Sequence, residues 1–185
     1  MDIGTIVNFV GVIVTSIGLI ITIILFFIQQ KKTWLLNSAI MTTNFVDKFN
    51  DSEFRKIRRE FATESIKIIN NEQANMASAV QILGFYENIG YLTRRGVLDK
   101  EMIWNKFSWT AIRYFFLLDN KAGFLKYLRI KEQDNLLYSE FSWLSKEMII
   151  ISQKKGNDNY ATSNWTDEVI NTRISELIEQ EKNLL

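Results

Sequence analysis

The N-terminal part of the chain carries an apolar run with no charged residue between Ile6 and Ile28. A helix of this length spans the hydrocarbon core of a bilayer. Small and polar residues recur along it at intervals of 4, 3, 4, 3 and 4: Gly4, Asn8, Gly11, Thr15, Gly18 and Thr22. Apolar side chains gain nothing by associating in lipid, so membrane helices pair through small residues that let their backbones approach closely. We therefore expect a membrane-spanning helix that self-associates through this seam of six residues.

Two other interpretations of the seam stay open. Gly and Thr are common in membrane helices that have no partner, and several copies of a polar seam arranged in a ring would line a pore. Gln29 and Lys32 continue the same face, so the seam becomes charged at its C-terminal end. Asn8 offers a hydrogen bond between helices, although such bonds average only about 0.6 kcal/mol in membranes.

After this run, apolar residues recur every three or four positions, which predicts helices and no strands. We expect Asn50 to cap the second helix, with Glu53 three residues later completing a capping box. A third helix is predicted from about residue 72 to 95, closed by Gly96 as the glycine that follows a helix end. Asp99 is expected to cap the fourth helix.

Residues 119–120 are expected to open the next helical region, with a break near residues 131–134. The polar segment 152–164 has no periodicity and is predicted to be a linker. The sequence thus predicts an all-α fold: one N-terminal transmembrane helix, a cytoplasmic helical bundle and a C-terminal amphipathic helix. The expected parts are a transmembrane anchor (residues 1–32), a juxtamembrane stalk helix (33–49), the bundle (50–151), the linker (152–164) and the last helix (165–185).

Composition narrows the chemistry that this chain can perform. It has no Cys and no His, so thiolate nucleophiles, disulfides and the commonest general base and metal ligand are all missing. We therefore expect no catalytic residues, no cofactor and no bound metal, and keep a carboxylate enzyme with a divalent cation as a remote alternative. The net charge of +1 gives no bulk attraction to nucleic acid, so no nucleic-acid partner is expected.

The distribution of basic residues predicts how the helix is oriented. No Lys or Arg precedes the apolar run, whereas Lys31 and Lys32 follow it directly. Because basic residues flanking a span stay in the cytoplasm, we expect the N-terminus outside and the C-terminal domain inside the cytoplasmic (inner) membrane. The acidic Asp2 and the length of the run favour an uncleaved anchor over a signal peptide.

One acidic and two basic residues fall among apolar neighbours: Glu87, Arg113 and Arg129. A buried carboxylate needs a partner, because burial without one raises its pKa and neutralises it. Arg94, Arg113 and Arg129 are the candidate partners of Glu87. We expect Glu87 to form a structural ion pair or to cap a neighbouring helix, with contact to a ligand as the alternative.

Basic residues also cluster at the start of the second predicted helix: Arg55, Lys56, Arg58 and Arg59. Together with Lys31 and Lys32 they form a candidate surface for anionic lipid head groups or a phosphate. Glu53, Glu60 and Glu64 lie about one turn away, so a solvated face of ion pairs along the helix is the alternative.

Four short motifs between residues 83 and 148 carry a family resemblance: Phe85-Tyr86-Glu87-Asn88-Ile89, Arg95-Gly96-Val97-Leu98-Asp99, Ile112-Arg113-Tyr114-Phe115-Phe116 and Arg129. They resemble a family of small bacterial single-pass membrane proteins of unknown function. Where that family usually has a Trp after the aromatic Tyr, this chain has Phe115. The resemblance implies a hydrophobic N-terminus followed by a helical cytoplasmic domain, and it implies no activity.

These observations favour a non-enzymatic, membrane-anchored and self-associating protein. Its cytoplasmic bundle would act as a scaffold or sensor that binds a protein or a small ligand, with membrane lipid around its anchor. The alternative is a membrane-acting effector, for example in bacterial stress or phage defence, whose clustered spans perturb the bilayer or form a pore.

Overall fold

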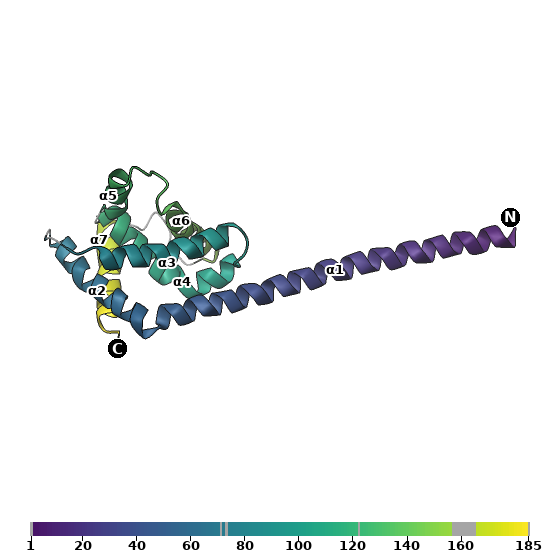
Figure 1. Ribbon diagram of the computed structural model, residues 1–185, viewed down its shortest axis with the longest axis horizontal. Helices are drawn as coiled ribbons and strands as arrows, with labels where there is room; N and C mark the ends of the chain where they lie inside the picture. Colours follow the sequence, from purple (N-terminus) through teal and green to yellow (C-terminus); the bar gives the residue numbers. More distant parts are fainter. Residues whose placement is uncertain (1, 71, 73, 122, 157–165, 185) are drawn as a thin grey trace. The chain divides into compact units, whose positions relative to one another are not determined.

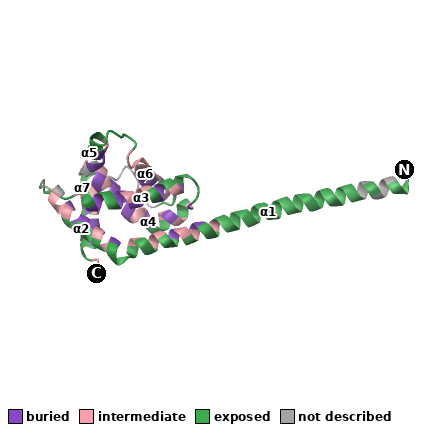
Figure 2. Ribbon diagram, in the orientation of Figure 1, coloured by how far each residue is buried: buried purple, intermediate pink, exposed green. Residues whose placement is uncertain are grey.

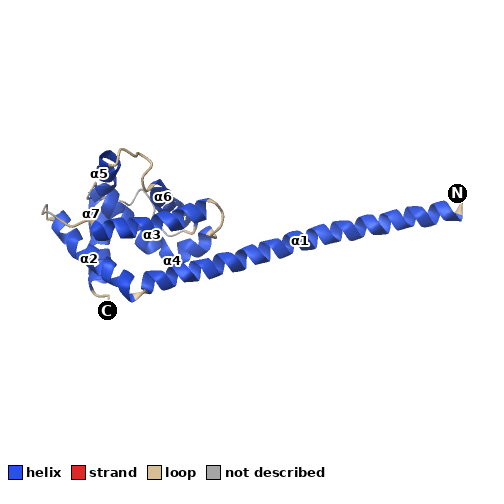
Figure 3. Ribbon diagram, in the orientation of Figure 1, coloured by secondary structure: helices blue, strands red, loops and turns tan. Residues whose placement is uncertain are grey.

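The computed structural model describes residues 2–70, 72, 74–121, 123–156 and 166–184. Within these residues every regular element is a helix (Figure 3), which confirms the predicted all-α class. The chain divides into two compact units, Met1–Ser38 and Ala39–Leu185, and each is described by itself.

The first unit is the N-terminal part of helix α1, which runs from Ile3 to Asn50. Every residue from 11 to 28 is exposed (Figure 2), including the apolar side chains of Ile17, Ile24 and Phe27. Among the described residues, α1 is the one helix long and apolar enough to cross a membrane by length and composition. The expected long apolar helix near the N-terminus is therefore present.

The second unit is a bundle built from the end of α1 and the helices that follow it (Figure 1). Its further α-helices are α2 (Ser52–Ile69), α3 (Ala77–Arg94), α4 (Lys100–Phe115), α5 (Phe124–Lys131), α6 (Ser139–Lys154) and α7 (Asp167–Lys182). A π-helical turn, η1 (Phe116–Lys121), continues α4. Helix α3 packs on α6 and α2, and α7 packs on α2 and α4.

Aromatic rings fill the centre of this bundle. Tyr86 of α3 is fully buried, and its ring contacts those of Phe107, Tyr114 and Phe141 at centroid distances of 6.3, 5.7 and 5.6 Å. Its hydroxyl shares a hydrogen bond with the hydroxyl of Thr110, so the one polar atom of this ring is satisfied. Burial of a large apolar side chain contributes about 1.5–3 kcal/mol, so these rings contribute substantially to the stability of the bundle.

Two of the predicted helix boundaries match the structure closely. Gly96 has a φ of 71°, a value that favours glycine, and the bonds Gly96 N–H to Thr93 and Val97 N–H to Leu92 close α3 in a Schellman motif. The carboxylate of Asp99 caps α4 by accepting the Met102 N–H at 2.9 Å. Both motifs are complete within a few residues of sequence.

Other boundaries differ from the prediction. Asn50 is the last residue of α1, and Asp51 caps α2 instead, accepting the Glu53 N–H at 2.9 Å. Helix α3 begins at Ala77, where the Asn75 side chain accepts the Ala77 N–H, rather than at residue 72. Asp119 lies inside η1, and α5 starts only after Gly123, whose φ is 59°.

The segment predicted as a linker is helical at its start, because α6 continues to Lys154. Residues 157–165 lie outside the described part of the chain. The last helix, α7, begins after Thr166, whose hydroxyl accepts the Val169 N–H at 3.4 Å. Its buried residues, Ile174, Leu177, Ile178 and Glu181, lie on one face, as expected for an amphipathic helix.

Candidate functional site

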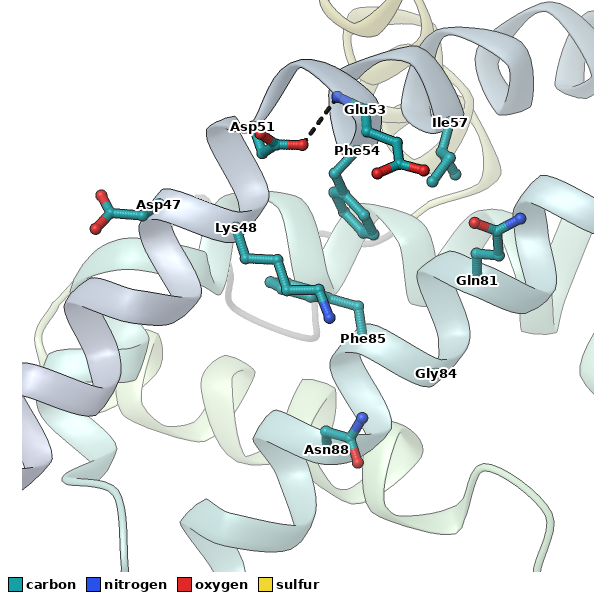
Figure 4. Close-up of a pocket in the computed structure, with 10 residues that line it drawn as sticks. All are labelled: Asp47, Lys48, Asp51, Glu53, Phe54, Ile57, Gln81, Gly84, Phe85 and Asn88. Atoms are coloured by element: carbon teal, nitrogen blue, oxygen red, sulfur yellow. Dashed lines mark hydrogen bonds between the residues drawn. The ribbon is translucent and has the colours of Figure 1, made fainter.

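The bundle carries an open groove where the end of α1, the start of α2 and the middle of α3 meet (Figure 4). Its volume is about 640 Å³. Phe54 and Phe85 form its floor, with their ring centroids 4.8 Å apart. Ile57 adds apolar surface, and polar side chains line the remainder: Asp47, Lys48, Asp51, Glu53, Gln81 and Asn88.

Local sequence explains why the chain leaves a groove here. Helix α1 ends at Asn50 and α2 starts at Ser52, so Asp51 alone makes the corner between them and caps the new helix. Gly84 faces the groove from the middle of α3, and a Cβ atom there would meet no other atom within 4 Å. Because Gly84 has no side chain, this wall of the groove stays open, although no close contact requires a glycine there.

The groove combines an aromatic floor with a polar rim. Ligand sites in proteins are typically concave, with apolar walls and a few polar groups that orient the ligand. Lys48 extends along the groove beside Phe85 (Figure 4), while the carboxylates of Asp51 and Glu53 stand at the corner. No group of His, Cys, Asp or Glu able to hold a metal ion occurs among the described residues. The aromatic floor and the polar rim of the groove suit binding through apolar contact and hydrogen bonds.

Glu87 lies outside this groove, on the side of α3 that faces α6. Its carboxylate accepts the backbone N–H of Phe141 at 2.7 Å and that of Glu140 at 3.3 Å. Of the two structural roles expected for Glu87, the structure shows the helix cap. Burial raises the pKa of the Glu87 carboxyl, and the two backbone bonds only partly oppose this rise.

Arg113 and Arg129, the other two charges predicted among apolar residues, both have partners, and neither forms an ion pair with Glu87. Arg113 is buried and donates to the Trp109 carbonyl at 3.0 Å and to the Glu176 carboxylate at 3.2 Å. Arg129 donates to the Leu137 carbonyl at 2.9 Å and to the Ser142 hydroxyl at 3.1 Å. Arg129 therefore ties α5 to the turn before α6 and to α6 itself.

The basic cluster of α2 separates into exposed and buried members. Lys56 and Arg59 are exposed and Arg55 is partly buried, but Arg58 is only 2% exposed. Arg58 pairs with Glu181 of α7, so it is removed from the predicted lipid- or phosphate-binding surface. The helical period explains this correction, since Arg58 follows Phe54 by four residues and shares its inward face. Lys31 and Lys32 of α1 are exposed.

The seam residues whose side chains the structure describes are all exposed on α1: Gly4, Asn8, Gly11, Thr15, Gly18 and Thr22. The hydroxyls of Thr15 and Thr22 donate to the carbonyls of Gly11 and Gly18 at 2.8 and 2.9 Å. Asn8, Gly11 and Thr15 border a shallow hollow on the helix surface, together with Val12 and Ser16.

Sequence analysis missed two features of the bundle. Gly84 had no local signal that distinguished it from other glycines, because only the fold shows that it faces a groove. The pairing of Arg58 with Glu181 joins residues 123 positions apart. A charged residue on the apolar stripe of α7 was the available clue, since Glu181 follows Leu177 by four residues.

Comparison with known proteins gives a family and no activity. No curated protein and no solved structure matches this chain. One family matches residues 6–148, which cover most of α1 and the bundle as far as Met148 in α6. The match includes the groove, Glu87, Arg58 and Arg113, and stops before α7. The chain therefore belongs to the family described as Domain of unknown function (DUF4760).

Proposed function

We propose that this protein is a membrane-anchored, self-associating scaffold or sensor. In this proposal α1 spans the cytoplasmic membrane with its N-terminus outside, and the bundle binds a protein or small-ligand partner in the cytoplasm. The observation that carries the proposal is the exposure of every residue from 11 to 28, a segment of α1 with no charged residue.

An apolar helix with no protein cover is stable only in an apolar solvent. Leu, Ile, Phe and Val each favour the centre of a bilayer by about 0.3–0.6 kcal/mol on insertion scales. Apart from Thr15, Ser16, Gly18 and Thr22, every residue from Val12 to Ile28 is one of these four types. Every Lys and Arg of the chain follows this segment, which favours a cytoplasmic C-terminal domain.

The contacts within α1 support packing by the seam rather than a water-filled pore. The hydroxyls of Thr15 and Thr22 are already bonded to the backbone of their own helix. A Cβ atom at Gly11 or Gly18 would meet nothing within 4 Å, so both positions are free to receive a neighbouring helix. A face of glycines and internally bonded threonines lets two backbones approach closely.

The groove supplies a binding surface for the second half of the proposal. It lies on the bundle, it has an aromatic floor, and its rim offers both carboxylates and an amine. A scaffold or sensor needs such a surface on the side of the membrane where its partner is found. Self-association through α1 would then bring several grooves together and raise their apparent affinity for a multivalent partner.

Replacement of Gly11 by Ile tests self-association, with Val12→Ile as the matched control. Gly11→Ile places a branched side chain on the seam, whereas Val12→Ile adds one methylene group beside it. We expect detergent-solubilised Gly11→Ile to form smaller assemblies than wild type, and Val12→Ile to match wild type, by native mass measurement. Equal assembly of all three proteins would remove the seam from the proposal.

A second measurement separates the scaffold or sensor from the membrane-acting effector. Expression of a scaffold or sensor leaves the membrane potential of the host cell unchanged. Loss of that potential with wild type, and its recovery with Gly11→Ile, would contradict the proposal and favour an effector that perturbs the bilayer.

A further inference from the structure

Helix α7 is held to the bundle by a buried carboxylate. Both oxygens of Glu181 meet the Arg58 guanidinium, Oε2 at 2.8 Å from Nε and Oε1 at 2.9 Å from Nη2. The hydroxyl of Tyr114 donates to Oε1 at 2.8 Å. Burial by itself lowers the pKa of Arg58, but the bond to Glu181 and the neighbouring groups raise it overall. Arg58 of α2 and Tyr114 of α4 thus form a binding site for one carboxylate.

A second arginine lies under the same helix. Arg113 of α4 is 2% exposed, stacks on the Trp109 ring at 3.9 Å and bonds to Glu176 of α7 at 3.2 Å. Glu176 also accepts from Arg173 within α7 at 3.2 Å. Burial tends to raise the pKa of Glu176, but the two arginines lower it overall. Arg58 and Arg113 thus each bind a glutamate of α7, and the two glutamates are five residues apart.

The contact of α7 with the bundle also has an apolar part. Three hydrophobic side chains of α7 are buried: Ile174, Leu177 and Ile178. A buried ion pair adds little net stability, because desolvation of both charges offsets their attraction, but it discriminates strongly between partners that do and do not carry the charge. Helix α7 is therefore held both by apolar burial and by ion pairs that make the contact selective for charge.

The family match adds an independent observation. It ends at residue 148, so it contains Arg58, Tyr114 and Arg113 but not the glutamates that they bind. The two buried arginines therefore lie in the family domain, whereas their counter-charges come from a helix beyond the matched region.

We propose that the surface of α2 and α4 beneath α7 is a docking site for an acidic amphipathic helix. Helix α7 occupies it in this chain, and a partner protein that presents the same pattern displaces α7. The pattern is glutamate, two apolar residues and then a second glutamate five positions after the first, as in Glu176, Leu177, Ile178 and Glu181. The occupant must supply a carboxylate to Arg58, since no other acidic group bonds to this guanidinium among the described contacts.

The test uses the full chain with a protease site introduced between residues 157 and 165. After cleavage in detergent, a fluorescent peptide of residues 166–184 is added, and its binding is followed by anisotropy. We expect the cleaved protein to exchange α7 for the peptide, and the uncleaved protein to bind it at least about tenfold more weakly, because the tethered α7 competes.

Peptide variants separate recognition of the carboxylate from general helix packing without disturbing the fold of the protein. We expect Glu181→Gln to weaken peptide binding at least about tenfold, and Glu179→Gln, the same change at an exposed position, to leave it unchanged. Equal binding of the Glu181→Gln and wild-type peptides would overturn the proposal. Unfolding of the protein on cleavage, or complete failure to exchange, would also overturn it, because α7 would then be a permanent part of the core.

Discussion

The carboxylate of Glu87 accepts the backbone N–H of Phe141 at 2.7 Å, so helix α3 caps the N-terminus of helix α6. The first backbone N–H groups of a helix have no partner within it. Tyr138, the residue before α6, has a φ of 57° and gives no side-chain cap. Glu87 therefore supplies, from 54 positions away, the side-chain oxygen acceptor that a local Asp or Ser usually provides.

We expect Glu87→Gln to lower the free energy of unfolding of the protein by about 0.5–2 kcal/mol, the range for loss of a helix cap. The amide keeps one acceptor oxygen but turns its NH₂ group toward the other N–H. Chemical denaturation measures this effect. Glu60→Gln, at an exposed position in α2, is the control and should change stability by less than about 0.5 kcal/mol. A loss of about 3–5 kcal/mol would indicate a buried ion pair instead.

The stabilising effect of Glu87 should depend on pH in a defined direction. Burial raises the pKa of Glu87 above its usual value of 4.5. The folded protein therefore holds this proton more tightly than the unfolded chain, and the resulting stability is lost as the pH rises through the raised pKa. We expect the free energy of unfolding of wild type, relative to Glu87→Gln, to fall as the pH rises from about 4.5 through the raised pKa of Glu87. A difference that grows with pH would mean that folding lowers the pKa of Glu87 instead.

Two glycines of α3 should respond in opposite ways to the same substitution. A Cβ atom on Gly84 meets nothing within 4 Å, whereas one on Gly90 collides with the backbone carbonyl of Glu140. We expect Gly84→Ala to raise the free energy of unfolding by about 0.5–1 kcal/mol, the gain in helix propensity. Gly90→Ala should lower it by about 1–3 kcal/mol, because α3 and α6 must separate. Denaturation of both variants gives the comparison, and equal effects would mean that the α3–α6 approach is looser than described.

Features that depend on neighbouring residues could be predicted from the sequence. The apolar run of α1, the glycine end of α3 at Gly96 and the cap at Asp99 each follow from a few consecutive positions. Near residue 50 the cap was placed one position early, because Asn50 and Asp51 are both good caps and only the length of α1 decides between them.

Features that depend on the fold could not be predicted from the sequence. Gly84 and Gly90 are both mid-helix glycines, and only the position of α6 makes one of them essential. Glu87 was expected to face an arginine or a helix end, and the choice depended on where α6 begins. In the sequence Arg58 lies among three other basic residues and nothing distinguishes it from them. Its burial follows from the fold, in which α7 brings Glu181 to it.

Arg58 and Glu181 should show strong energetic coupling. Arg58→Met or Glu181→Gln alone leaves a buried charge without its partner, a change that costs about 3–5 kcal/mol in comparable pairs. Arg58 also donates to the Phe49 carbonyl at 2.9 Å and stacks on the Phe49 ring at 3.6 Å, so its loss also disturbs the end of α1.

We therefore expect the double variant Arg58→Met/Glu181→Gln to lose at least about 1 kcal/mol less than the sum of the single variants. Denaturation of the four proteins measures this coupling. Arg59→Met with Glu181→Gln is the control cycle, because Arg59 is exposed, and its two effects should add. Additive losses in the Arg58 cycle would show that the pair contributes no specific interaction.

The orientation of α1 can be tested by reporter fusions after Leu185. We expect a fluorescent protein at this position to be active and a periplasmic phosphatase to be inactive, because every Lys and Arg follows the apolar segment. Lys31 and Lys32 are the basic residues nearest to its end, so Lys31→Gln/Lys32→Gln combined with Asp2→Lys should shift part of the population to the opposite orientation. Lys56→Gln/Arg59→Gln removes the same number of basic charges from the bundle and should leave the orientation unchanged. An active phosphatase on the wild-type chain would place the groove and the surface of α2 and α4 beneath α7 outside the cytoplasm, and the proposed cytoplasmic partner would then be excluded.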